Sequence, residues 1–140
     1  MPTFTINTNI PAGKVPDDFL QTTAELVARS LGKPLSKQYM QAHWTAGCKS
    51  GSGALLYPNF RYVVVHISTD QKMSFGGSTE PCAIANLYSI GCLGDAENKK
   101  HSAALFKHVQ KTLGIKGDRM YINFFDMPAT DVGYNGKTFG

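Results

Sequence analysis

The stretch that decides the fold is Thr3-Phe4-Thr5-Ile6-Asn7-Thr8, in which polar and apolar side chains alternate. Successive side chains of a β-strand point to opposite faces, so this pattern predicts a strand with one face in the core and one face toward polar surroundings. Apolar residues with helical spacing follow over residues 16–31. Pro16 suits the first turn of a helix there, and Gly32 suits its end.

A second unit repeats this plan further along the chain. Residues 83–90 and 120–126 have the composition of strands, and residues 98–113 have the apolar spacing of a helix that Gly114 ends. Residues 62–67 form the strand that completes the first unit. Strands joined by a crossover helix pair in parallel. The sequence therefore predicts an α/β fold in which two β-α-β units form one four-stranded mixed sheet with two helices on one face.

The spacing between these elements sets residues 37–61 apart. Five residues separate Gly114 from Met120, whereas the first unit has 25 additional residues between Ser36 and Tyr62. Joining Ser36 to Tyr62 makes the two connections nearly equal, so residues 37–61 are predicted to be an inserted loop. Three interpretations stay open, namely an irregular or disordered surface loop, a lid over a pocket, and a segment added by splicing without a selected role.

Composition favours a single domain over residues 1–140, because 42% of the residues are hydrophobic and the length is that of one domain. We expect a protein made in the cytoplasm without membrane insertion, because neither a signal segment nor a membrane-length apolar run is present. The formal net charge is +4. Lys37, Lys49 and Arg61 account for three of these charges, which leaves +1 of mixed pattern, so nucleic-acid binding is not expected.

The cysteines and histidines predict neither a disulfide framework nor a metal site. Cys48, Cys82 and Cys92 are odd in number and irregularly spaced, which fits reduced thiols better than bridges. None of the four histidines has a cysteine or carboxylate cluster at ligand spacing. We therefore expect reduced cysteines and no bound metal.

Pro2 follows the initiator methionine. A small residue in second place normally permits removal of Met1, which leaves a secondary amine at the edge of a sheet. A partly apolar pocket beside a cation lowers the pKa of such an amine toward neutrality, because both influences disfavour the protonated form. The plainer interpretation is that Pro2 only marks where the methionine is removed.

Five segments carry a resemblance to a known family. In chain order they are Asn7-Thr8-Asn9-Ile10-Pro11, Gly32-Lys33-Pro34, Met73-Ser74-Phe75-Gly76-Gly77-Ser78-Thr79-Glu80-Pro81-Cys82-Ala83, Ser89-Ile90-Gly91 and Asp118-Arg119-Met120-Tyr121-Ile122-Asn123-Phe124-Phe125-Asp126-Met127. Together they resemble the macrophage migration inhibitory factor family, relatives of D-dopachrome tautomerase, over nearly the whole chain except residues 37–61. The resemblance implies a homotrimer whose three sheets surround a central channel, with residues 131–139 adding a short strand to a neighbour.

The resemblance also implies an activity. It makes Pro2 the catalytic base of a keto–enol tautomerase that acts on phenylpyruvate, a small aromatic keto acid, or on dopachrome. Lys33 then binds a substrate carboxylate, and Asn123 bonds a substrate oxygen. The other substrate-binding residues that it implies are Ile90, Tyr121, Tyr62, Tyr134 and Phe139. Such proton transfer needs one base, one cation and apolar walls, but no metal and no organic cofactor.

Most of these residues have a plainer explanation. Lys33 suits the negative end of the preceding helix dipole. Ile90 has the composition of a core residue. Tyr121 and Asn123 alternate on one strand face, where a cross-strand contact is the ordinary role.

The same resemblance implies a second function, that of an immune cytokine. Such a protein binds a cell-surface receptor such as the invariant chain of class II histocompatibility complexes, and it leaves the cell by a non-classical route because it has no signal segment. A third interpretation is a variant disabled by its insertion. The Cys-x-x-Cys motif credited with thiol–disulfide activity in many relatives lacks its second thiol, which is replaced by Ala85, so that activity is not expected.

Overall fold

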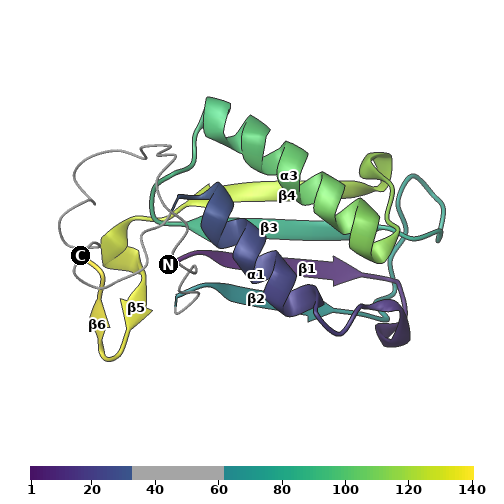
Figure 1. Ribbon diagram of the computed structural model, residues 1–140, viewed down its shortest axis with the longest axis horizontal. Helices are drawn as coiled ribbons and strands as arrows, with labels where there is room; N and C mark the ends of the chain where they lie inside the picture. The colour runs from purple at the N-terminus through teal and green to yellow at the C-terminus, as the bar shows by residue number, and fades with distance from the viewer. Residues whose placement is uncertain (33–61) are drawn as a thin grey trace.

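The computed structural model describes residues 1–32 and 62–140 of the chain. These residues form two layers, with a four-stranded sheet covered on one face by two helices (Figure 1). The main elements are β1 (Thr3–Thr8), α1 (Phe19–Ser30), β2 (Val64–Ser68), β3 (Ala83–Ser89), α3 (Asp95–Leu113) and β4 (Met120–Asp126). A hairpin of β5 (Gly133–Tyr134) and β6 (Lys137–Thr138) follows, and short 3-10 helices span Ala12–Lys14, Gly117–Arg119 and Ala129–Asp131.

The strand order is β2-β1-β3-β4. β1 runs parallel to β2 and β3 runs parallel to β4, while the two inner strands β1 and β3 are antiparallel. This topology confirms the predicted α/β fold of two β-α-β units and one mixed sheet. It also corrects one detail, because Pro2 lies where an inner strand begins and not at an edge strand of the sheet.

The core lies between the sheet and the helices. Phe4 and Ile6 of β1 are fully buried, as the alternation in the sequence predicts. On α3 the buried residues recur every fourth position, which places one side of the helix on the sheet. These residues are His101, Leu105, Val109 and Leu113. Gly114 ends the helix with a φ of 69°, a left-handed conformation that costs glycine little.

One polar contact bridges the two helices. The ring nitrogen Nε2 of His108 lies 2.9 Å from the hydroxyl of Thr23, which is fully buried, and the His108 ring stacks on Phe19. Burial lowers the pKa of His108 below its ordinary value of 6.5, and Lys111 lowers it further, while Asp18 acts in the opposite direction. Neutral His108 is therefore the form that the folded protein favours.

This helix contact predicts an acid-sensitive contribution to stability. The folded chain binds a proton at His108 more weakly than the unfolded chain does. The contribution is therefore complete above pH 6.5 and is lost as the pH falls through the lower folded-state pKa. Thermal unfolding of the wild type should lose more stability over this range than that of His108→Gln, which keeps a polar side chain without a titrating ring. Equal losses in the two proteins would contradict this expectation.

The cysteines differ from the prediction. Cys92 is disulfide-bonded, so the expectation of reduced thiols is wrong for this residue. Cys82 is free and buried, and Cys48 lies outside the described residues. Three cysteines leave room for one bridge and one free thiol, and spacing along the chain does not show which ones folding brings together.

Within residues 1–32 and 62–140, no helix is both long and apolar enough to cross a membrane. The same residues contain no cluster of three or more histidine, cysteine or acidic side chains that could hold a metal ion.

Candidate active site

Pro2 is held in place by the backbone of the neighbouring strand. It is buried, and its carbonyl oxygen accepts a hydrogen bond of 3.0 Å from the amide of Val64 at the start of β2. With Met1 attached, the nitrogen of Pro2 belongs to a peptide bond and cannot take up a proton. Removal of Met1 converts this nitrogen into a secondary amine without touching the hydrogen bond that fixes the residue.

Three aromatic side chains pack against one another, namely Tyr62, Tyr134 and Phe139. We call them the aromatic cluster. The ring of Tyr62 packs edge-on against Tyr134 at 5.4 Å between centroids and against Phe139 at 6.5 Å. Tyr134 and Phe139 stack at 5.7 Å. Since Tyr62 lies two residues before Val64, the aromatic cluster lies at the Pro2 end of the sheet, where Figure 1 shows the β5–β6 hairpin near the N-terminus.

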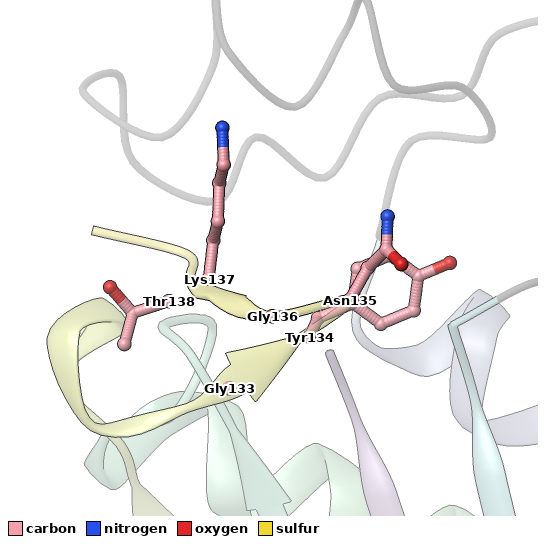
Figure 2. Close-up of a pocket in the computed structure, with 6 residues that line it drawn as sticks. All are labelled: Gly133, Tyr134, Asn135, Gly136, Lys137 and Thr138. Atoms are coloured by element: carbon pink, nitrogen blue, oxygen red, sulfur yellow. The ribbon is translucent and has the colours of Figure 1, made fainter.

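The hairpin gives Tyr134 a fixed position. Asn135 and Gly136 both have positive φ, at 52° and 78°, which is typical of a tight hairpin turn. Residues 133–138 line a wide-open hollow with a volume of about 620 Å³. Figure 2 shows Tyr134 and Asn135 together at one side of the hairpin, while the side chain of Lys137 points away from it.

The end of the chain is bonded to its own protomer. The amide of Phe139 lies 3.1 Å from the carbonyl oxygens of both Ala129 and Val132. The short strand expected in residues 131–139 is therefore present as two-residue strands that pair with each other. Its addition to a neighbouring chain stays a prediction.

Ile90 lies at the same end of the sheet as Pro2. Ile90 directly follows Ser89, the last residue of β3. The residue before Ser89, Tyr88, is paired with Thr3, the first residue of β1. Ile90 is buried, and the next residue, Gly91, donates a hydrogen bond of 2.8 Å to the carboxylate of Asp126. The backbone around Ile90 is thus tied to the end of β4.

Tyr121 and Asn123 project from the face of the sheet that the helices leave uncovered. Both side chains are exposed, while their neighbour Ile122 packs on the core. Through the strand register, Tyr121 is level with Asn7, five residues along β1 from Pro2. At 3.3 Å per residue this separation is about 16 Å, so one protomer does not bring Tyr121 and Pro2 together.

Lys33 and residues 37–61 lie outside the described residues. The cationic role of Lys33 and the three interpretations of the insertion therefore stay predictions.

Sequence reasoning missed a connection between Tyr121 and a loop before β3. The ring of Tyr121 lies 5.0 Å from that of Phe75, and the guanidinium of Arg119 lies 5.7 Å from the Phe75 ring centre. Arg119 also donates hydrogen bonds to backbone carbonyls of residues 75–81. The only sign in the sequence was that Arg119 directly precedes β4. Many arginines precede strands without such a role, so this position did not reveal its contacts.

The fold and the site together define a class. Each half of the sheet is one parallel β-α-β unit, and the two units pair antiparallel. With a proline at the start of an inner strand and aromatic rings at the same end of the sheet, this arrangement is that of an α/β protein with a tautomerase-like fold. The sequence model described as "Macrophage migration inhibitory factor (MIF)" matches the chain in two overlapping segments, residues 1–59 and 48–140. The chain belongs to the macrophage migration inhibitory factor family, a member of the tautomerase superfamily.

Individual relatives cover nearly all of the chain. The macrophage migration inhibitory factor homolog of Trichuris trichiura is 44% identical over 99% of this chain and 100% of its own length. The macrophage migration inhibitory factor of Rattus norvegicus is 37% identical over 99% of both chains. The solved structure of the factor from Trichinella spiralis matches with a TM-score of 0.79 and 44% identity, over 98% of this chain and 99% of that one.

Proposed function

We propose that the protein is a keto–enol tautomerase that acts on small aromatic α-keto acids such as phenylpyruvate, and on dopachrome. The observation that carries the proposal is the buried Pro2, which Val64 holds at the same end of the sheet as the aromatic cluster, in a chain of this family. Burial disfavours a protonated amine, and the proposed cation Lys33 acts in the same direction, so an N-terminal proline between them can accept a proton near neutral pH.

The reaction requires only the movement of a proton. The nitrogen of Pro2 takes a proton from the carbon next to the ketone, and the freed electron pair forms the carbon–carbon double bond of the enol. Protonated Pro2 then gives this proton to the carbonyl oxygen, which regenerates the free amine. The reverse sequence regenerates the ketone. Tyr62, Tyr134 and Phe139 supply apolar walls for the aromatic ring of the substrate, while Lys33 and Asn123 are proposed to bind its carboxylate and a second oxygen.

A complete site is proposed to require a second copy of the chain. Tyr121 and Asn123 lie far along the sheet from Pro2 in one protomer, so they are proposed to meet the Pro2 of a neighbour within a homotrimer. The uncovered sheet face supports such assembly, because Tyr121 is 63% exposed and Phe125 is 41% exposed. Sedimentation of the purified protein should give the mass of three chains. A fully active monomer would contradict the two-chain site.

Turnover of phenylpyruvate tests the enzymatic proposal. Purified protein whose mass confirms the loss of Met1 should interconvert the enol and keto forms well above the spontaneous rate, followed by the ultraviolet absorbance of the enol. A rate equal to the spontaneous one would contradict the proposal. Deletion of residues 37–61 from such an inactive protein would then show whether the insertion is the cause.

A second candidate function is signalling as a cytokine, exported from the cytoplasm by a non-classical route. Similarity to migration inhibitory factors over nearly the whole chain favours it. The proposed partner is an invariant-chain-type receptor. Binding of the receptor ectodomain by both wild type and Pro2→Gly would separate signalling from catalysis, while absence of binding by either protein would count against the cytokine.

A further inference from the structure

A row of polar side chains crosses the uncovered face of the sheet. Thr5 of β1 is opposite Asn86 of β3, which is opposite Asn123 of β4. The amide nitrogen Nδ2 of Asn123 donates to Oδ1 of Asn86 at 2.9 Å. Nδ2 of Asn86 in turn donates to the hydroxyl oxygen of Thr5 at 3.4 Å. The hydrogen bonds therefore run in one direction, from the edge strand β4 toward the inner strand β1.

The amide of an exposed asparagine has two ends of opposite character. Its nitrogen has two donor hydrogens and its oxygen only accepts, so a half-turn of the group exchanges what it offers a ligand. In Asn123 one hydrogen of Nδ2 is used by Asn86, which leaves the second hydrogen and the oxygen Oδ1 for other partners. The contact with Asn86 selects one of the two orientations.

Thr5 anchors this arrangement to a strand that packs on the core. Its neighbours Phe4 and Ile6 are both fully buried, so the backbone of β1 at Thr5 is fixed by the core. Thr5 is also β-branched, which restricts its side chain to few rotamers.

We propose that Asn86 is a positioning residue that holds the amide of Asn123 with its free N–H directed at the substrate oxygen. This inference rests on the proposed function, which gives Asn123 contact with the substrate. Asn86 itself does not touch the substrate or the base. Its effect is therefore on substrate affinity and not on the proton transfer at Pro2.

The test is the kinetics of phenylpyruvate tautomerisation by Asn86→Leu, which has a similar volume but no hydrogen-bonding group. A net hydrogen bond of about 0.5–1.5 kcal/mol corresponds to a rise of about 2- to 12-fold in KM, with kcat nearly unchanged. Thr5→Val should raise KM in the same direction by a smaller factor, because it weakens only the second hydrogen bond. His66→Leu is the matched control, because His66 is paired with Thr5 on the far side of the row from Asn86. The KM of the His66→Leu variant should equal that of the wild type.

A double-mutant cycle separates positioning from general damage to the sheet. In an Asn123→Ala background, Asn86→Leu should leave KM unchanged, because no amide remains to be oriented. The same fold increase in both backgrounds would overturn the inference, as would an unchanged KM for Asn86→Leu. If Asn86→Leu does not fold, Thr5→Val decides by the same cycle. If the wild type is active and Asn86→Leu has the same KM, this inference alone is contradicted. If the wild type is inactive, the proposed function is contradicted and this inference with it.

Discussion

Pro2→Gly should lower kcat/KM for phenylpyruvate by at least about 100-fold, the lower end of what a positioned general base contributes. Glycine keeps an amine at the N-terminus, but it loses the ring that fixes the direction of the nitrogen lone pair and gains backbone freedom. The carbonyl of residue 2 can still accept the hydrogen bond from Val64. The variant thus changes the base while its attachment to β2 is kept.

The control for this variant is its stability. Thermal unfolding of Pro2→Gly should show only a modest loss of stability, because the buried ring is removed and glycine gives the unfolded chain more freedom, while the core residues are unchanged. A loss of activity with intact folding then assigns the effect to the nitrogen. Wild-type kcat/KM in a correctly processed Pro2→Gly protein would remove Pro2 from the mechanism.

Arg119→Ala should lower the free energy of unfolding by about 2–3 kcal/mol, the size of effect seen when one network of hydrogen bonds to a charged group is lost. The guanidinium donates to the carbonyl oxygens of Pro81 at 3.0 Å and Glu80 at 2.9 Å. It also donates to those of Phe75 at 3.3 Å and Ser78 at 3.2 Å. These carbonyls are partly exposed, so water recovers some of the lost bonding and keeps the loss below the sum of four separate bonds.

Arg119→Lys is the matched variant, and chemical denaturation measures both. Lysine keeps the positive charge but lacks the planar fork that reaches several acceptors at once, so it should recover less than half of the loss. The loop that carries Phe75 should also become freer in Arg119→Ala, which removes support from the Tyr121 ring. Wild-type stability of Arg119→Lys would show that charge alone holds this loop.

Much of the fold was predictable because its periodicities are strong. Alternation in β1 placed Phe4 and Ile6 in the core, and the crossover lengths required parallel pairs. The helix starts were less accurate. The first helix begins at Phe19, because residues 16–19 form a turn in which Pro16 accepts a hydrogen bond from the Phe19 amide.

The second helix begins at Asp95, three residues before the predicted start. Its extra residues carry no apolar face, so the pattern did not reveal them. They are stabilised instead by local interactions, because Asp95 and Glu97 lie in the first turn. The backbone N–H of Asn98 also donates a hydrogen bond of 2.8 Å to the carbonyl oxygen of Gly94. Acidic side chains in that turn interact favourably with the positive end of the helix dipole, and apolar spacing gives no sign of this interaction.

The site was less predictable than the fold. The roles of Tyr62, Tyr134 and Phe139 came from the family resemblance, because residues so far apart in sequence give no local sign that their rings meet. Arg119 and Asn86 were missed for a different reason. Their partners are backbone carbonyls and a side chain on a neighbouring strand, and only the register of the folded sheet brings these groups together.

The central claim is that the nitrogen of Pro2 is the base, and one added residue tests it most directly. Phenylpyruvate turnover should be compared between protein whose mass shows that it begins at Pro2 and protein with one alanine inserted before Pro2. The alanine converts the amine into an amide while every original side chain stays in the chain. We predict a loss of at least about 100-fold in kcat/KM. Equal turnover by the two proteins would contradict the assignment of Pro2 as the base.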